Sequence, residues 1–323
     1  MKIQRRTLSG AAGLAALALA MSVPVPAAAQ KWPDKPIRVI VPYPAGGAAD
    51  AIARAIGPGL GDLLGQPIVV ENRGGAAGAI GADMVAKAAP DGYTLLLTPT
   101  TQPTNTTLDP PAPYRADRDF MPIIGITLTP LVYAAGTSFK GEGFAAFRQA
   151  AAGGKLTYGS YGQGTSTHIL LAMLSEQLNL GMTHVPYKGE SPMVTDMLAG
   201  TIDSGLVSIG LTRAHAGKLK PLALVGTSRS SYLPGVPTFN ELGVKGLDWD
   251  YGVGLYAPAK VPAEIITRLE AEMQKVLKRD DVVKALAQRS YEPWGLPSKA
   301  LHRQMLEDMK RWDALGEKAK ALR

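Results

Sequence analysis

Residues 37–50 read IRVIVPYPAGGAAD, and this stretch predicts how the folded chain begins. Its first five residues are rich in β-branched side chains, which favours a strand. The Pro- and Gly-rich residues that follow end the strand, and Asp50 stands where a helix N-cap belongs. Apolar residues at helical spacing then continue to Leu64, and Pro58 predicts a kink within that helix. The stretch therefore predicts a strand, a glycine-rich loop and a helix in succession.

The alternation of strand and helix continues beyond this first unit. Residues 68–70 form a second β-rich run, and a turn at 72–75 leads into a helix that ends near Ala88. Residues 94–97 form a third predicted strand. A β-α-β-α-β order implies a parallel sheet with right-handed crossovers.

The remainder of the chain resumes this pattern after a Thr-, Pro- and Asn-rich loop at 98–114. Pro262 stands where a helix begins, as the preference of proline for the first helical turn predicts. The length of 323 residues suits two lobes, and two α/β lobes would hold a ligand in the crevice at the carboxyl ends of their strands. The further strands are predicted at 131–135, 156–158, 183–185, 204–207, 222–225 and 251–256. The further helices are predicted at 144–152, 165–178, 191–199, 263–278, 281–288 and 298–322.

The first 29 residues have the pattern of a signal peptide. A basic start that includes Arg5-Arg6 precedes an Ala- and Leu-rich run of about 13 residues, and small residues at 27–29 form a cleavage site. The run is too short to span a membrane. The arginine pair fits the twin-arginine export route, and an ordinary secretory signal fits as well. Cleavage after Ala29 would remove three positive charges and reduce the net charge from +7 to +4. We therefore expect a soluble protein in an oxidising extracytoplasmic compartment.

The residue content argues against several other classes of protein. Lys and Arg are dispersed among acids, which favours solvated helix faces over a nucleic-acid surface. With no cysteine, disulfides and thiolate metal sites are excluded, and the four histidines lack metal-binding spacing. Tyr158 stands where a G-x-S-x-G nucleophile elbow around Ser160 needs its first glycine. No catalytic residue, cofactor or metal site is predicted, although an enzyme is not excluded.

Two loops share a design that favours anions. Residues 44–49 and residues 160–165 each lead from a predicted strand into a helix start and consist largely of small residues. Small residues let the backbone approach a ligand, and free N–H groups at a helix start attract an anion. Asp50 is interpreted as a helix cap rather than as a ligand-facing acid. Lys188 fits either pairing with a carboxylate or an ordinary surface position.

The chain resembles the Bug-type periplasmic solute-binding proteins of tripartite tricarboxylate transporters in an ordered set of segments. Each segment alone is a weak signal, and their order from end to end makes the resemblance specific. The segments are 32–38 (WPDKPIR), 41–47 (VPYPAGG) with Asp50, 64–73 (LGQPIVVENR), 86–95 (AKAAPDGYTL), 184–189 (HVPYKG), 233–238 (LPGVPT) and 257–259 (APA).

This resemblance implies a two-lobed, Venus-flytrap α/β fold with two mainly parallel sheets flanked by helices and a ligand cleft between the lobes. It implies that residues 1–29 are a signal peptide, that residues 30–127 plus 253–323 form the first lobe and that residues 128–252 form the second. It further implies that the two loops and ordered water hold a small carboxylate. The expected ligand-binding residues are Tyr43, Ala45, Gly46, Gly47, Ala48, Ala49, Thr100, Ser160, Tyr161, Gly162, Gln163, Gly164, Thr165, Tyr187, Lys188 and Asp203.

The implied partners are the carboxylate and the large and small membrane subunits of a tripartite transporter, with the protein itself a monomer. One departure from the family pattern bears on the ligand. Ala48-Ala49 stand where hydroxyl residues or glycine often follow the paired glycines, so we expect a drier cleft with aromatic walls. This favours a carboxylate with an apolar or aromatic body, for example the aromatic dicarboxylate terephthalate. A ligand-binding subunit of a sensory system and a secreted enzyme are the alternative functions.

Overall fold

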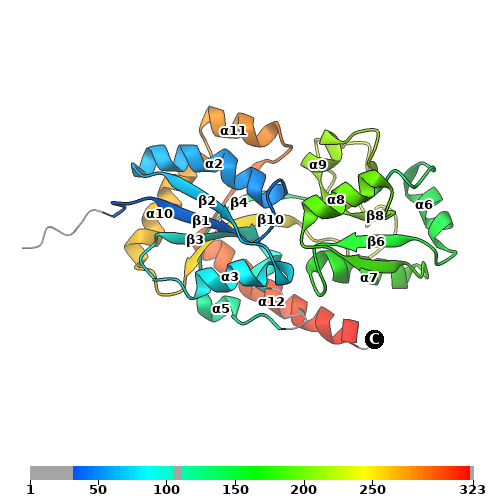
Figure 1. The fold of residues 1–323 in the computed structure, drawn as a ribbon, viewed down its shortest axis with the longest axis horizontal. Helices are drawn as coiled ribbons and strands as arrows, with labels where there is room; N and C mark the ends of the chain where they lie inside the picture. The colour runs from blue at the N-terminus through cyan, green and yellow to red at the C-terminus, as the bar shows by residue number, and fades with distance from the viewer. Residues whose placement is uncertain (1–31, 105–110, 321–323) are drawn as a thin grey trace, which may run out of the picture. The chain divides into compact units, whose positions relative to one another are not determined.

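The computed structural model describes residues 32–104 and 111–320, and Figure 1 shows their arrangement. The predicted signal peptide lies outside the described residues. Two β-sheets, each flanked by helices, form the body of the chain from Lys35 onward. Both sheets are mixed rather than mainly parallel as predicted, because antiparallel strands pair beside the parallel ones. No helix in the described ranges is both long enough and apolar enough to cross a membrane.

The first sheet has six strands in the order β11-β4-β10-β3-β1-β2. β1 pairs in parallel with β2 and with β3, as the β-α-β-α-β prediction requires. β10 is antiparallel to both β3 and β4, and β11 is antiparallel to β4. The strands of this sheet are β1 (Ile37–Val41), β2 (Ile68–Asn72), β3 (Thr94–Pro99), β4 (Phe120–Thr129), β10 (Tyr251–Pro258) and β11 (Pro293–Pro297).

The second sheet has five strands in the order β7-β6-β8-β5-β9. β6 is parallel to β7 and to β8, and β5 is antiparallel to β8 and to β9. The chain leaves the first sheet at Pro130, between β4 and β5, and returns to it between β9 and β10. The strands of this sheet are β5 (Leu131–Ala135), β6 (Thr157–Ser160), β7 (Thr183–Pro186), β8 (Ser204–Ser208) and β9 (Lys220–Val225).

Helices cover both faces of each sheet (Figure 1). In the first sheet, α2 contacts α10 and α11 on one face, while α3, α5 and α12 cover the other. In the second sheet, α7 and α8 lie on opposite faces of β6 and β8. The helices are α2 (Ala48–Leu64), α3 (Ala79–Ala86), α4 (Thr101–Thr104), α5 (Ala116–Asp119), α6 (Gly143–Ala151), α7 (Ser166–Gln177), α8 (Glu190–Ala199), α9 (Ile209–Ala214), α10 (Ala263–Val276), α11 (Asp280–Ala287) and α12 (Ser298–Lys320), with a 3-10 turn η1 at Ala76–Gly78.

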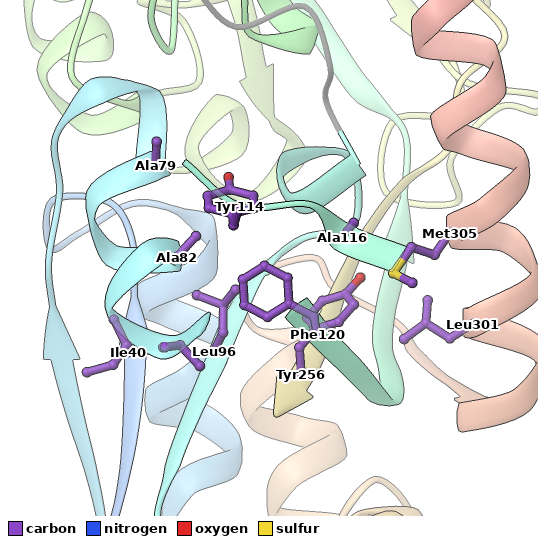
Figure 2. Close-up of a cluster of buried hydrophobic side chains, with 11 residues drawn as sticks. Ile40, Ala79, Ala82, Leu96, Tyr114, Ala116, Phe120, Tyr256, Leu301 and Met305 are labelled. Carbon is purple, nitrogen blue, oxygen red and sulfur yellow. The ribbon is translucent and has the colours of Figure 1, made fainter. Parts of the chain in front are cut away.

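A buried apolar cluster beneath α3 and α12 joins segments that are distant in sequence (Figure 2). Ile40 of β1 and Leu96 of β3 lie in it with Tyr256 of β10, and Leu301 and Met305 of α12 close it. These side chains are almost wholly buried, and each large apolar side chain contributes about 1.5–3 kcal/mol on burial. The C-terminal helix therefore belongs to the core of the first sheet, although the sequence places it more than 200 residues from β1.

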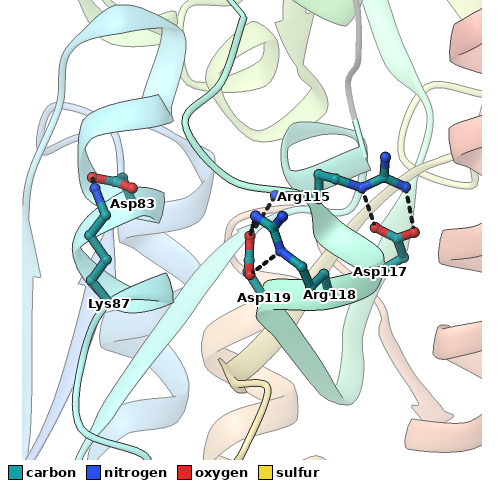
Figure 3. Close-up of polar contacts among 6 residues, drawn as sticks. All are labelled: Asp83, Lys87, Arg115, Asp117, Arg118 and Asp119. Atoms are coloured by element: carbon teal, nitrogen blue, oxygen red, sulfur yellow. Dashed lines mark hydrogen bonds and ion pairs between the residues drawn. The ribbon is translucent and has the colours of Figure 1, made fainter.

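Ion pairs lie at the edge of this cluster (Figure 3). Arg115 pairs with Asp117, Arg118 pairs with Asp119, and Lys87 pairs with Asp83. The basic side chains of these pairs are more than 60% exposed, so each pair contributes little to stability.

The predicted helices and strands agree with the structure except at a few positions. Asp50 is not the N-cap of α2, because the helix begins at Ala48 and Gly47 occupies the N-cap position. Pro262 is likewise the N-cap of α10 rather than its first helical residue. The helix α2 continues through Pro58. The elements β4, β11, α5 and α9 were not predicted, and α4 lies in the stretch predicted to be a loop.

Candidate functional site

The loop between β1 and α2 bonds its backbone N–H groups to carboxylates. Gly47, the N-cap of α2, has no side chain with which to accept the free N–H groups of the first turn. The Gly46 N–H donates to Asp50 Oδ2 at 3.0 Å, and the Ala48 N–H donates to Glu190 Oε2 at 2.9 Å. Gly46 adopts a φ of +86°, a conformation that glycine enters without steric cost. The start of α2 is thus a binding site for carboxylate oxygens.

Asp50 is held in its charged form. Burial raises the pKa of its carboxyl, but hydrogen bonds from Arg54 and from the Gly46 N–H outweigh burial and hold that pKa below its ordinary value. The Arg54 Nε lies 2.9 Å from Asp50 Oδ1. Asp50 therefore has a cationic partner within its own helix.

Glu190 connects the two sheets. It is the first residue of α8, and its residue surface is only 6% exposed. Its Oε1 accepts the N–H of Ser208, at the end of β8, at 2.6 Å, and its Oε2 accepts the N–H of Ala48. Burial raises the pKa of Glu190, although the hydrogen bonds from Ser208 and Ala48 oppose that shift. One buried carboxylate thereby bonds α2 of the first sheet to β8 of the second.

The loop between β6 and α7 bonds its N–H groups to neutral acceptors nearby in sequence. The N–H of Tyr161 donates to Thr167 Oγ1 at 3.0 Å, and the N–H of Gly162 donates to Ser160 Oγ at 3.2 Å. The Gly164 N–H donates to the ring nitrogen Nδ1 of His168 at 3.1 Å. Thr165 caps α7 by accepting the His168 N–H. This second loop is largely self-contained.

Two stacked histidines contact the second loop. The rings of His168 and His184 stack with centroids 3.9 Å apart, and His184 Nε2 lies 2.7 Å from Ser160 Oγ. Burial, together with the neighbouring His168, lowers the pKa of His184 to about 4. Ser160 is fully buried and lines neither of the cavities described below, so its bond to His184 orders the loop instead of presenting a nucleophile.

Two small adjoining cavities lie where the two loops meet, and both are lined by Tyr43, Tyr161 and Tyr251. The first cavity also contacts Pro44, Gly47, Ala48, Ala49, Asp50, Pro99 and Glu190. The second also contacts Ala77, Thr101, Gln102, Thr165 and Ser166. A shallower groove between α2 and β2, lined by residues such as Arg54 and Gln66, lies away from both loops and brings none of the expected site residues together.

The second cavity has an unsatisfied polar group. Gln102 is buried, with only 5% of its residue surface exposed, and its Nε2 donates to Tyr114 Oη at 2.6 Å. Within the described ranges, the amide oxygen Gln102 Oε1, which can only accept a hydrogen bond, has no partner. Across the same cavity, Thr101 Oγ1 and Ser166 Oγ lie 3.3 Å apart. Such groups suit the polar end of a bound solute.

Six of the expected site residues line these cavities. They are Tyr43, Gly47, Ala48, Ala49, Tyr161 and Thr165. The loop residues Ala45, Gly46, Ser160, Gly162, Gln163 and Gly164 shape the two loops without lining either cavity.

The structure places the other four expected residues elsewhere. Thr100 is buried and donates its N–H to the Gly252 carbonyl, and Lys188 is exposed. The Tyr187 hydroxyl donates to Asp196 at 2.7 Å. Asp203 precedes β8, at the opposite end of that strand from Ser208, and accepts hydrogen bonds from Thr157 and Ser138. No group of acids and histidines in the described ranges could hold a metal ion.

A comparison with known sequences decides the family. The family described as "Tripartite tricarboxylate transporter family receptor" matches residues 52–320. The chain belongs to this family. It is 36% identical over 309 residues to the "UPF0065 protein in tcbD-tcbE intergenic region" of Pseudomonas sp. strain P51, covering 94% of this chain and 92% of that protein. It is 33% identical to the protein BugT of Bordetella pertussis, covering 84% of this chain and 85% of BugT.

Solved structures of receptors in this class share the fold. The periplasmic binding protein BugD superposes with a TM-score of 0.84 at 28% identity, over 90% of this chain and 99% of BugD. MatC from Rhodopseudomonas palustris with bound malate gives a TM-score of 0.82 at 28% identity, over 88% of this chain and 100% of MatC. A further R. palustris protein, with adipate, gives a TM-score of 0.82 at 28% identity, over 90% of this chain and 98% of that protein. The predicted family and the two-lobed binding-protein fold are confirmed.

For a receptor of this family, several residues of the site were missed by sequence reasoning. Glu190, Tyr251, Gln102 and Ala77 line the cavities, and Asp50 was assigned a capping role only. Ala77 has a φ of +55°, a strained conformation for a residue with a side chain. Glu190 directly follows the segment that ends in Tyr187-Lys188-Gly189, which is a positional signal that only the family resemblance offered.

Proposed function

We propose that this receptor captures a small carboxylate between its lobes and delivers it to the membrane subunits of a tripartite transporter in the periplasm. The observation that carries the proposal is the hydrogen bond from the Ala48 N–H to a carboxylate oxygen of Glu190 at the start of α2. This contact supports carboxylate recognition, because the helix start already accommodates such an anion. Malate and adipate in the similar structures support the same class of ligand.

We propose that the lobes divide near the points where the chain changes sheets, with residues 30–127 plus 253–323 in the first and 128–252 in the second. These bounds put the last two residues of β4 and the first two of β10 in the second lobe. The hinge would then include Pro130, between β4 and β5, and the connection between β9 and β10. A ligand that contacts both lobes stabilises the closed arrangement by its differential contacts. The closed receptor, exported through its N-terminal signal and acting as a monomer, would present both lobes to the large and small membrane subunits.

The three tyrosines of the cavities support a ligand with an apolar or aromatic body. Tyr43, Tyr161 and Tyr251 surround the meeting point of the loops, and Ala48 and Ala49 offer no hydroxyl groups there. Aromatic carboxylates, with terephthalate as the dicarboxylate example, therefore belong in the first panel of ligands tested.

A thermal-shift screen of the purified protein against aliphatic and aromatic mono- and dicarboxylates tests the proposal. A ligand at about 100 times its dissociation constant stabilises the folded protein by about 2.7 kcal/mol, which raises Tm by several degrees. Isothermal titration of each hit gives its affinity, and small-angle scattering checks compaction on binding. A panel in which no carboxylate shifts Tm would refute carboxylate capture.

A further inference from the structure

The start of α8 packs directly against the loop that begins α2. Gly189, the N-cap of α8, lies so close to this loop that an added Cβ would be 3.1 Å from Pro44 Cδ. Its φ of +146° is a conformation that residues with a side chain rarely adopt, so glycine permits both the turn and the close approach. The approach brings the carboxylate of Glu190 to the N–H of Ala48, which Oε2 accepts at 2.9 Å.

The other bonds of the Glu190 carboxylate hold it to the second sheet. Its Oε1 accepts the N–H of Ser208 at 2.6 Å, and the side chain of Tyr161 also forms a hydrogen bond with it. Ser208 ends β8 and Tyr161 follows β6, whereas Ala48 begins α2 beside the first sheet. If the sheets move apart, Glu190 therefore keeps its partners Ser208 and Tyr161 and gives up the N–H of Ala48.

The cavities at the meeting point of the loops are too small for the proposed ligand. The first has a volume of about 20 Å³ and the second about 10 Å³. A cavity of about 10–15 Å³ on this measure holds one water molecule, so a dicarboxylate such as malate fits in neither. Ala48 and Glu190 both line the first cavity. Entry of a ligand there requires the two walls to move apart, and that movement breaks the hydrogen bond between them.

A ligand carboxylate at the start of α2 would compete with Glu190 for the same donor. The Ala48 N–H has one hydrogen to donate, and Glu190 accepts it. A second carboxylate beside Glu190 would also place two like charges together in a partly desolvated site. The contact between Ala48 and Glu190 and a ligand bound to Ala48 are therefore alternatives.

We infer that Glu190 is an internal competitor of the ligand, whose carboxylate occupies the start of α2, holds the two sheets together there and lowers the affinity for carboxylates. The inference rests on the proposed carboxylate capture. Only the fraction of receptor in which this contact is broken can bind a ligand at Ala48, and the apparent affinity falls in proportion to that fraction. Glu190 is thus a positioning residue that sets affinity without recognising the ligand.

Isothermal titration of Glu190→Gln with malate, adipate and terephthalate tests the competition. The amide has nearly the size of the carboxylate but has no charge and only one acceptor oxygen, so it cannot accept from both Ala48 and Ser208. We expect the variant to bind at least one of these ligands about threefold or more tightly than the wild type, because more of the receptor is open. Loss of a purely structural bond would weaken binding. Glu176→Gln, at an exposed acid on α7, is the matched control and should bind as the wild type does.

Small-angle scattering from the ligand-free proteins tests the contact itself. Ala48→Pro removes the N–H that Glu190 accepts, and Ala48 is the first residue of α2, where proline is well tolerated. We expect Ala48→Pro and Glu190→Gln to be more expanded than the wild type, and Glu190→Gln to compact more on ligand binding. Ala48→Pro also lacks the donor for a ligand, so it should not share the gain in affinity.

The results separate this inference from carboxylate capture. Unchanged or weaker binding by Glu190→Gln, or ligand-free variants as compact as the wild type, overturns the inference and leaves capture intact. A carboxylate that binds only Glu190→Gln supports both. If no carboxylate binds either protein, capture is rejected and scattering decides whether the contact holds the sheets together. If Glu190→Gln does not fold, the scattering of Ala48→Pro against the wild type decides the same question.

Discussion

The loops that begin α2 and α7 both follow a strand and are rich in small residues, but they bond their backbone N–H groups to different partners. The α2 loop donates to Asp50 of its own helix and to Glu190, which belongs to α8 beside the other sheet. The α7 loop donates to Ser160, Thr167 and His168, all within its own segment. Small residues after a strand therefore permit either arrangement. The side chains that come close in the folded protein decide whether such a loop reaches a charge on another element or is satisfied locally.

The difference also concerns helix capping. Thr165 caps α7 with its own hydroxyl, whereas Gly47 leaves α2 without a side-chain cap. Glu190 takes over part of that role from the other sheet. The α7 loop is thus preformed, and the α2 loop depends on contact between the lobes.

Replacing Gly162 with valine should disrupt ligand binding most strongly. Gly162 has a φ of +135°, and a Cβ added there would lie 3.0 Å from the Cβ of Ala77 on the facing segment. The strain costs about 1–3 kcal/mol of folding free energy, and the clash should hold the lobes apart and lower ligand affinity more than tenfold. Calorimetry with a ligand found in the panel measures the loss. Gly153→Ala, where an added Cβ meets nothing within 4 Å, is the control, and equal losses in both variants would contradict the explanation.

Acid should destabilise the support of the α7 loop. The folded-state pKa of His184 is about 4, below the ordinary value of 6.5, so the unfolded chain binds a proton first. The stabilising contribution is complete above about pH 6.5 and is lost as pH falls toward 4. Because the ring is partly exposed, we expect about 1–2 kcal/mol after allowing for solvent screening.

Urea unfolding between pH 4 and 7 measures this effect. His184→Gln removes the titrating group and should flatten the profile in that window. An unchanged slope in the variant would show that other groups control the acid dependence.

Removing the cap of α7 should have a smaller effect. Thr165→Ala deletes an oxygen that accepts the His168 N–H and donates to the Gly162 carbonyl at 2.7 Å. We expect a loss of about 1 kcal/mol in unfolding free energy, measured by urea denaturation. Thr195→Ala, on an exposed position of α8 outside the first turn, serves as the comparison. A loss no larger than that of the comparison would mean that the α7 loop is not stabilised by its cap.

Adding a cap to α2 should have the smallest effect. Gly47 has an extended backbone with φ −83°, and an added Cβ would lie 3.7 Å from Glu190 Oε2, an ordinary contact. Gly47→Ser supplies a hydroxyl that can accept an N–H of the first turn and should raise the unfolding free energy by a few tenths of a kcal/mol. Differential scanning calorimetry measures the change. A destabilisation above about 1 kcal/mol would show that the α2 start has no place for a further acceptor.

Local sequence patterns predicted most elements of the fold, and the exceptions have physical causes. The strand β4 contains Pro122 and Gly125, which argue against a strand when read alone. Pairing with β10 on one side and β11 on the other overrides these preferences, with register shifts along both ladders. The short helix α9 forms because Ser208 caps it directly at the end of β8, where no long apolar pattern marks it.

The site was predicted less completely than the fold. Sequence patterns identified both loops because glycine and small residues at a strand-to-helix turn have a local meaning. Glu190 could not be found in this way, since its partner Ala48 is 142 positions away along the chain. Asp50 was placed at the right loop but given the wrong capping position. Asp203 and Lys188 were expected near the ligand, and the structure puts one at the far end of β8 and the other in solvent.

The sequence by itself determined the alternation of strands and helices, the two small-residue loops and the membership of the receptor family, because these depend on interactions between residues near in sequence or on ordered motifs. Only the tertiary structure decided which acceptors those loops bind. It brought a buried carboxylate from α8 to the start of α2 and left the α7 loop to its own hydroxyls and histidine. The reason is that a backbone N–H takes whichever acceptor the folded chain places within about 3 Å, and that proximity is a property of packing.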